Sequence, residues 1–218
     1  MLARDERAGQ RHSELILGMI DALMQEAGVT LRHLRGIGFG AGPGSFTGLR
    51  IACGIAQGMA LGAGLPVAPV GTLECLAQAS GALRVVSALD ARMGEIYHAA
   101  YERSQTGWRT LCAPNLCRPQ DAPELEGEDW VGCGSGFAAY GEALQERYGG
   151  ALTAVQPELY PHARDVAAIA ALVFTSGKGV DPAEAAPLYI RDKVALSIAE
   201  RAEEKLAAAI ETAGLHAR

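Results

Sequence analysis

The sequence is poor in aromatic residues and contains no run of basic side chains. Phenylalanine, tryptophan and tyrosine make up 6% of its 218 residues, so it offers little aromatic surface for stacking. The chain has 19 Lys and Arg against 25 Asp and Glu, which gives a net charge of −6. Proteins that hold nucleic acid alone draw much of their affinity from basic side chains on phosphates. The composition therefore disfavours direct, unaided binding of RNA.

The histidines and cysteines show no recognisable metal-binding or disulfide pattern. No His-x-x-x-His, His-Glu-x-x-His or Cys-x-x-Cys spacing occurs, and the number of cysteines is odd. Zinc and iron sites are commonly built from such spacings, and thiols in a reducing cytosol stay unpaired. We therefore expect no metal of its own and free thiols. The residues concerned are His12, His33, His98, His162 and His216, and Cys53, Cys75, Cys112, Cys117 and Cys133.

The sequence also lacks a signal peptide and a membrane-spanning run. Residues 1–14 are charged and have no apolar core. The longest apolar stretch, 51–70, is interrupted by several glycines and by Pro66, so it predicts a buried helix followed by a strand. We expect a cytoplasmic protein that makes no contact with a membrane.

What the sequence does contain is an ordinary globular composition and an alternation of helical and strand-like segments. Hydrophobic residues make up 49% of the chain and charged residues 20%. Ser13 is a plausible N-cap for the first helix, and Gly28 a plausible end. Asp90–Gly94 reads as the turn of a hairpin. Helices are expected at 12–27, 49–63, 72–80, 136–147 and 164–176, and strands at 35–40, 66–70, 83–89, 95–101, 108–113 and 130–133.

The sharpest motif is a glycine-rich loop within residues 40–50, GAGPGSFTGLR, between an expected strand and an expected helix. It has no Lys for a Walker loop, no third glycine for a dinucleotide fingerprint, and Pro43 interrupts a Gly-x-Ser-x-Gly elbow. Two interpretations stay open. The loop is either a tight turn whose serine caps the next helix, or a phosphate site at a helix N-terminus. In the second case the candidates are Gly42, Gly44 and Ser45.

Small residues recur with a spacing of four along the helix after this loop. Each glycine inside a helix costs about 1 kcal/mol relative to alanine, so several of them need a compensating reason. A face of small residues lets another helix approach closely, either within the chain or on a partner. The two sets are Ala52, Ala56 and Ala60, and Gly54, Gly58 and Gly62.

Two further residue combinations could suggest catalysis but have simpler explanations. Asp90 and Glu95 flank the expected turn and could be paired carboxylates of a glycosidase. A turn cap and a solvated strand residue explain them more simply. Ser45 has no obvious base nearby in the sequence, so a serine nucleophile is unsupported.

Several segments, in order, resemble the bacterial TsaB (YeaZ) family. They are GAGPGSFTGLRIACGIAQGMA, LPVAPVGTLECLA, ALDARMGEIYHAAY, VGCGSG with AAYGEAL, and APLYIRDKVAL, and the resemblance covers residues 12 to about 196. It implies an α/β, actin-like fold of two lobes, shared with sugar kinases and known as the ASKHA fold. We place an N-terminal lobe at 1–102, a C-terminal lobe at 103–195, and a final helix or tail at 196–218.

The resemblance also implies a function in tRNA modification. Such chains act beside a catalytic paralogue, TsaD, and an ATPase, TsaE, which together place threonylcarbamoyl on N6 of adenosine 37 in ANN-decoding tRNAs. TsaD-like chains carry a His-x-x-x-His metal motif where this sequence has Thr72 and Leu76, which are poor ligands. The resemblance therefore implies a non-enzymatic scaffold, despite the old label "glycoprotease-like". ATP, ADP and metal would be handled by its partners, and tRNA reached only through the complex.

The resemblance further implies that helices 12–27 and 47–63 pack against the same pair of helices on TsaD, or on a second copy when TsaD is absent. The interface candidates are Leu15, Met19, Leu23, Arg50, Cys53, Gly54, Ala56 and Gln57. A bulky residue at Gly54 or Ala56 should then weaken the complex. The alternative function is a small-molecule kinase or ATPase of the same fold that uses the glycine loop. A peptidase that uses Ser45 is a third reading.

The start of the sequence departs from the family pattern. Family members normally begin with a β-hairpin before the helix at 12–27, and residues 1–14 resemble only its end. A misplaced start codon, a truncation or a decayed copy would explain this, and we favour the first. If the truncation is real, the first lobe lacks strands at the centre of its sheet, and the exposed strand edges should make the protein poorly stable or prone to association.

Overall fold

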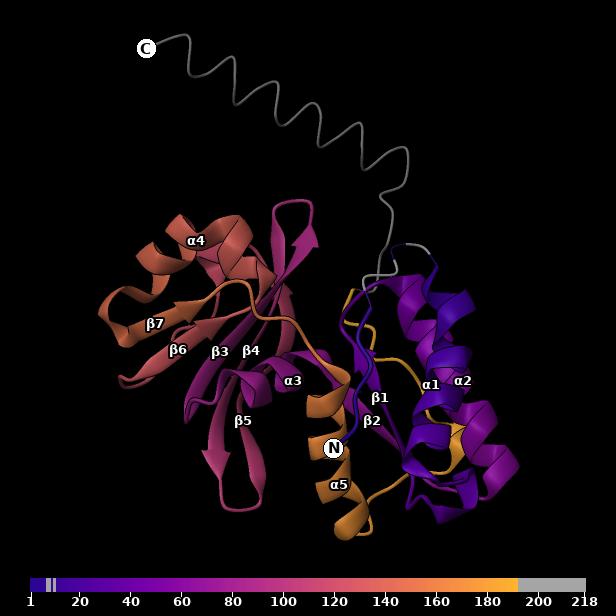
Figure 1. The fold of residues 1–218 in the computed structure, drawn as a ribbon. Coiled ribbons are helices and arrows are strands. Elements are labelled where there is room, and N and C mark those ends of the chain that lie inside the picture. Colours follow the sequence, from indigo (N-terminus) through magenta and orange to yellow (C-terminus); the bar gives the residue numbers. More distant parts are fainter. Residues whose placement is uncertain (7–8, 10, 192–218) are drawn as a thin grey trace, which may run out of the picture.

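The computed structural model describes residues 1–6, 9 and 11–191, and it shows two sheets with helices between and around them (Figure 1). The helix or tail predicted at 196–218 lies outside the described residues. The first lobe contains α1 (His12–Ala27), β1 (Ile37–Gly42), α2 (Phe46–Ala63) and β2 (Val67–Gly71). The second contains β3 (Arg84–Arg92), β4 (Glu95–Ser104), β5 (Gly107–Cys117), β6 (Trp130–Cys133), α4 (Ser135–Tyr148) and β7 (Leu152–Gln156). Helices α3 (Thr72–Ser80) and α5 (Ala163–Thr175) pack together between the two sheets.

The first-lobe sheet consists of β1 and β2, which pair in parallel from Ile37↔Val67 to Gly40↔Val70. Alternate side chains of a strand point to opposite faces of the sheet. Phe39 and Val67 therefore meet α2 on one face, while Ala68 and Val70 meet α5 on the other. This two-layer burial explains why β1 and β2 are short, apolar and rich in small residues.

The second-lobe sheet has five strands in the order β5-β4-β3-β6-β7. β3, β4 and β5 are antiparallel neighbours, whereas β3, β6 and β7 run parallel. Helix α3 covers one face with Leu73 and Leu76, and α4 covers the other with Phe137 and Leu144. The helix-bearing crossover from β6 to β7 is the connection that parallel neighbours require.

The sheets divide the chain at a different place from the predicted 102/103 boundary. That position falls inside β4, because Glu102 pairs with Arg109 of β5 in the second-lobe sheet. β3 and β4 therefore belong to the second lobe, and the division between the sheets lies between Ser80 and Arg84. Helix α5, which follows the second-lobe strands, returns to pack on β1 and β2.

Most local predictions are confirmed, with one error at the first helix. Helix α1 ends at Gly28 in the left-handed conformation, with φ 65°. Ser13 is not its N-cap, because the helix already begins at His12 and Arg11 occupies the cap position without a side-chain hydrogen bond. β3 and β4 form the predicted hairpin. Its two loop residues, Met93 and Gly94, have φ of 58° and 75°, as a type I′ turn requires.

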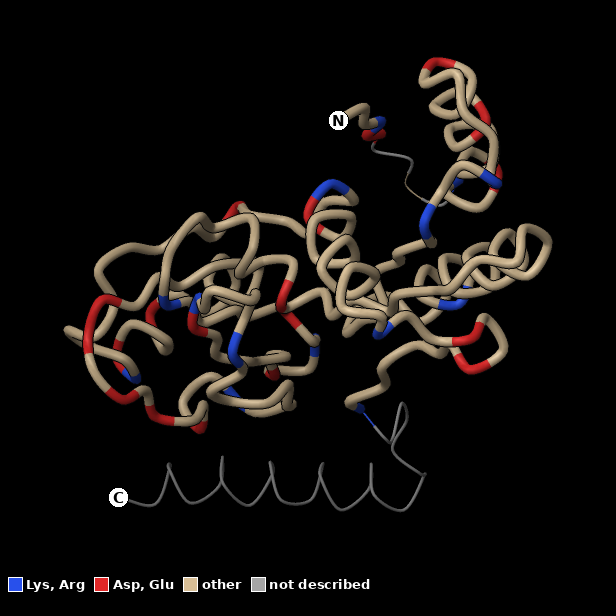
Figure 2. Tube along the Cα trace, turned by 90° about the horizontal axis from the view of Figure 1, so that it is seen from below, with Lys and Arg blue, Asp and Glu red and all other residues tan. Residues whose placement is uncertain are grey.

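Charged side chains of both signs are distributed over both lobes, and no continuous basic track appears in the described part of the chain (Figure 2). α2 has a single charged residue, Arg50. None of the described helices combines the length and the hydropathy needed to cross a membrane.

Candidate functional site

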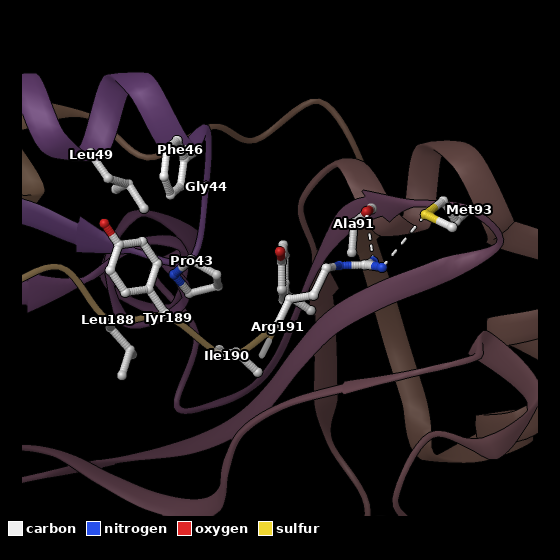
Figure 3. Close-up of a pocket in the computed structure, with 11 residues that line it drawn as sticks. Pro43, Gly44, Phe46, Leu49, Ala91, Met93, Leu188, Tyr189, Ile190 and Arg191 are labelled. Carbon is white, nitrogen blue, oxygen red and sulfur yellow. Dashed lines mark hydrogen bonds between the residues drawn. The ribbon is translucent and has the colours of Figure 1, made fainter. Parts of the chain in front are cut away.

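Three of the segments that carry the family resemblance meet at a cavity of about 250 Å³ between the lobes (Figure 3). They are the glycine-rich loop at the start of α2, the β3–β4 hairpin, and residues 185–191, here called the strap. The loop and α2 contribute Pro43, Gly44, Phe46 and Leu49, the hairpin Ala91, Met93 and Tyr97, and the strap Leu188, Tyr189, Ile190 and Arg191. Segments that are far apart in the sequence thus form one site.

Close contacts within the chain shape the glycine-rich loop. Gly42 has a φ of 119°, and a Cβ there would lie 2.8 Å from the Leu188 carbonyl oxygen, so only glycine fits. The Thr72 hydroxyl donates a hydrogen bond to the Pro43 carbonyl. Ser45 caps α2 by accepting a hydrogen bond from the Gly48 amide at 3.4 Å. The serine cap expected in the first interpretation of this loop is therefore present.

The strap connects the two lobes across the cavity. Its Leu188 amide donates to the Ala41 carbonyl of β1 at 2.7 Å. Its Arg191 side chain forms an ion pair with Glu95 at 2.8 Å and donates to the Ala91 carbonyl at 3.0 Å. The strap therefore fixes the β3–β4 hairpin relative to the glycine-rich loop.

A neighbouring cavity of about 320 Å³ shares Gly44, Ala91 and Tyr97 with the first, and it contains a carboxylate. Asp90 forms an ion pair with Arg92 at 3.2 Å and accepts a hydrogen bond from the Tyr140 hydroxyl at 3.3 Å. Burial, and then the charge of Asp90, raise the pKa of Tyr140.

The arginines at these two cavities are therefore already paired with carboxylates, Arg92 with Asp90 and Arg191 with Glu95.

The outer surface of α1 and α2 is the second candidate site. Helix α1 has no fully buried residue although it is largely apolar, and Leu17 remains 56% exposed. On α2, Leu61 is 74% exposed. A line of exposed residues on α2 is here called the outer stripe: Arg50, Gly54, Gly58, Leu61 and Gly62. A Cβ at any of its three glycines would meet nothing within 4 Å.

Comparisons with known proteins agree with this architecture. Residues 5–213 match the family model described as "TsaD: tRNA N6-adenosine threonylcarbamoyltransferase". The Escherichia coli protein named tRNA threonylcarbamoyladenosine biosynthesis protein TsaB is 39% identical, over 88% of this chain and 86% of its own. The protein of the same name from Haemophilus influenzae is 34% identical, over 87% and 84%. This chain belongs to the TsaB (YeaZ) family.

Solved structures show the same fold. A Pseudomonas aeruginosa protein described as similar to the peptidase YeaZ superposes with a TM-score of 0.76 and 36% identity, and the match covers 83% of this chain and 84% of that one. The mixed α/β, actin-like fold implied by the sequence is thereby confirmed. Within the described residues, the one hydrogen bond of the Ser45 side chain is to the Gly48 amide, so no serine–histidine pair supports peptidase chemistry here.

Thr72 and Leu76, at which the sequence resemblance expected the TsaD metal motif to be replaced, have structural roles in this chain. Thr72 holds the glycine-rich loop through Pro43, and Leu76 is fully buried in the second-lobe core. Neither side chain suits a transition metal. In residues 1–6, 9 and 11–191, no group of three or more His, Cys, Asp or Glu side chains is placed to hold a metal ion.

The structure corrects part of the predicted interface. Cys53 and Ala56 are 5% and 3% exposed and pack with Phe39 and Val67 in the first-lobe core. Gln57 points to the strap and donates to the Ala185 carbonyl at 3.0 Å. A tryptophan at Ala56 would disrupt this core rather than test an interface.

The other interface candidates are accessible to different degrees. Arg50 and Gly54 lie on the outer stripe, and Arg50 stacks on the Phe46 ring at 3.9 Å. Leu15 and Met19 line a shallow pocket together with residues 3–6. Leu23 instead faces a groove beside β1. α1 therefore presents only part of the predicted apolar face to solvent.

Sequence reasoning also missed the strap. Tyr189 accepts a hydrogen bond from Arg50 at 3.0 Å, and Arg191 reaches the hairpin on the other lobe. The segment was noticed only as part of a family pattern. Its own residues carry no local signal for a connector, because they act through contacts distant in sequence.

Proposed function

We propose that this chain is a non-catalytic subunit in the formation of N6-threonylcarbamoyladenosine at position 37 of tRNA, and that it acts by docking onto a TsaD-like catalytic subunit. The names of its relatives support a role in threonylcarbamoyladenosine biosynthesis. The match to a transferase family model supports descent from a common ancestor with that enzyme. The observation that carries the docking role is the outer stripe of α2.

Gly54, Gly58 and Gly62 lie inside a surface helix, and a Cβ at each would meet nothing within 4 Å. Packing inside this chain therefore does not require glycine at these positions, although each costs about 0.5–1 kcal/mol relative to alanine. The stripe from Gly54 to Gly62 spans about 12 Å of helix. A helix of a partner could approach this face closely, with Leu61 and Leu17 as flanking apolar contacts.

The residues of this chain also support an assignment of the metal and ATP to its partner subunits. In our proposal the TsaD-like partner holds the metal, because Thr72 and Leu76 occupy the corresponding positions here. ATP is handled by the partner subunits, including a TsaE-like ATPase, since the arginines of the cleft are already paired. The chain meets tRNA only within the cytoplasmic complex. Two copies could pair through the same surface when the partner is absent.

Replacing Gly58 with tryptophan tests the docking surface. Gly58→Trp places a bulky side chain in open space, so the isolated chain should fold normally while its affinity for the TsaD-like subunit falls about tenfold or more, equal to about 1.4 kcal/mol. Isothermal titration calorimetry with the purified TsaD-like subunit measures the affinity.

Gly141→Trp is the matched control, because Gly141 is also a helical glycine with open space around it but lies on α4 of the other lobe. It should leave the affinity unchanged. If both variants bind as tightly as the wild-type chain, α2 does not form the interface.

A further inference from the structure

The two lobes are joined by an apolar seam, formed by α3 and α5, and separately by the strap. Figure 1 shows both helices of the seam between the two sheets. Leu73 and Leu76 of α3 are fully buried in the second-lobe core. Cys75 of the same helix is fully buried against Val166 of α5 and Val70 of the first-lobe sheet. Each lobe therefore packs on the seam, and pulling either lobe off it would expose apolar surface to water.

Where the strap crosses, the lobes are not close-packed. The cavities of about 250 and 320 Å³ lie there, between the glycine-rich loop and the β3–β4 hairpin, and no residue of α3 or α5 lines either of them. Packed protein interiors contain few voids larger than a water molecule. Among the described residues, no hydrogen bond or ion pair runs directly from α1, β1, α2 or β2 to the second-lobe strands or α4. The lobes can therefore part on this side without breaking a packed core.

The first lobe holds the strap through its backbone and its core. The Leu188 amide donates to the Ala41 carbonyl of β1 at 2.7 Å, and the Ala185 carbonyl accepts from Gln57 of α2 at 3.0 Å. Ala185 is also 4% exposed and packs in the first-lobe core. The strap is thus structurally a part of the first lobe.

The second lobe holds the strap through one side chain. Arg191 pairs with Glu95 at 2.8 Å and donates to the Ala91 carbonyl at 3.0 Å. Within the described residues, every hydrogen bond and ion pair from the strap to the second lobe comes from Arg191. The side chains of Arg191 and Glu95 are 17% and 30% exposed, and salt weakens ion pairs that solvent can reach. Arg191 is therefore the contact that breaks most easily.

We propose that the strap is a latch between the lobes. The lobes open about the seam of α3 and α5, the strap stays on the first lobe, and the Arg191 side chain leaves the β3–β4 hairpin as they part. The described conformation is the latched one. This inference concerns the chain alone and does not rest on the proposed docking function.

Double electron–electron resonance on the full chain measures the separation of the lobes. Spin labels are attached to p-acetylphenylalanine introduced at Thr47, in the first turn of α2, and at Ala138, in the first turn of α4. Both positions are exposed, and this chemistry leaves the native cysteines unlabelled. Arg191→Met removes the charge and the donors but keeps a long side chain. The share of longer distances should rise about tenfold, because an ion pair and a hydrogen bond are lost together.

Arg147→Met is the matched control. Arg147 is held in the same way, since it donates to the Ala122 carbonyl at 2.6 Å and pairs with Glu124 at 3.4 Å, but all three residues belong to the second lobe. This substitution should leave the distance distribution unchanged.

Two further measurements distinguish a latch from a general loss of structure. Arg191→Glu alone should open the lobes, and combining it with Glu95→Arg should restore part of the closed population, because the ion pair returns with its charges exchanged. Hydrogen exchange at the Leu188 amide should be as slow in Arg191→Met as in the wild type, since the strap remains on the first lobe.

Three results would overturn the proposal. One is a distance distribution that Arg191→Met does not change, and another is equal opening in Arg147→Met. The third is faster exchange at Leu188 in Arg191→Met, which would show that the strap leaves the first lobe as well.

Discussion

At the scale of single residues, the most consequential buried polar group is His98 in the second lobe. It is fully buried, and its Nδ1 accepts a hydrogen bond from the Asn115 side-chain amide at 3.3 Å. The ring proton therefore lies on Nε2, which faces the Tyr148 hydroxyl at 2.8 Å. Burial lowers the pKa of His98 to about 4, so the ring stays neutral in the folded chain.

This histidine should make the protein sensitive to acid. The unfolded chain takes up a proton at His98 near pH 6.5 and the folded chain only near pH 4, so its contribution is present above pH 6.5 and is lost as the pH falls toward 4. Between pH 7 and pH 5 the free energy of unfolding should drop by about 2 kcal/mol from this group. Urea denaturation of the wild type and of His98→Gln at both pH values measures it. Equal losses in the two proteins would contradict this assignment.

At the scale of elements, α2 shows what the sequence could and could not predict. The helix, its serine cap and its unusual run of small residues were all readable, because caps and residue spacing are local features. The sequence did not show which of the two sets of small residues faces the core and which faces solvent. Alanines at 52, 56 and 60 and glycines at 54, 58 and 62 lie about 200° apart around the helix, and both sets permit close packing. Only the tertiary fold shows that Ala56 faces the core and Gly58 faces solvent.

The same limit applies to the other elements. The β3–β4 hairpin followed from two strand-like runs around a turn, whereas the assignment of these strands to the second-lobe sheet depended on a long-range pairing with β6. The strap could not be recognised as a connector from its own residues, because Leu188 and Arg191 act through contacts distant in sequence.

The outward glycines of α2 should be stability defects in the isolated chain. Gly54→Ala, Gly58→Ala and Gly62→Ala should each raise the free energy of unfolding by about 0.5–1 kcal/mol, because alanine restricts the unfolded backbone and meets no neighbour in the fold. Gly38→Ala is the contrasting variant. Its Cβ would lie 2.7 Å from the Ala170 Cβ, so it should destabilise the chain. Denaturant titrations decide the point, and destabilisation by the α2 substitutions would show that these glycines serve the fold.

At the scale of the whole molecule, two lobes are joined through α3, α5 and the strap around a cleft whose arginines are paired with carboxylates. Thr72 anchors the glycine-rich loop and Leu76 packs in the second-lobe core. Among the described residues, the outer stripe of α2 is exposed, and internal packing does not require its three glycines. Our account therefore assigns this chain the role of a docking subunit.

The most direct test is reconstitution of tRNA modification from purified components. Mass spectrometry would measure threonylcarbamoyladenosine formed on an ANN-decoding tRNA by TsaD-like and TsaE-like subunits from the same organism, with threonine, bicarbonate and ATP plus the enzyme that makes the threonylcarbamoyl adenylate. Our account predicts that the wild-type chain and Gly141→Trp raise the rate at least tenfold, that Gly58→Trp does not, and that the chain alone forms no product. Full-rate modification without this chain, or product formed by it without the TsaD-like subunit, would contradict the account.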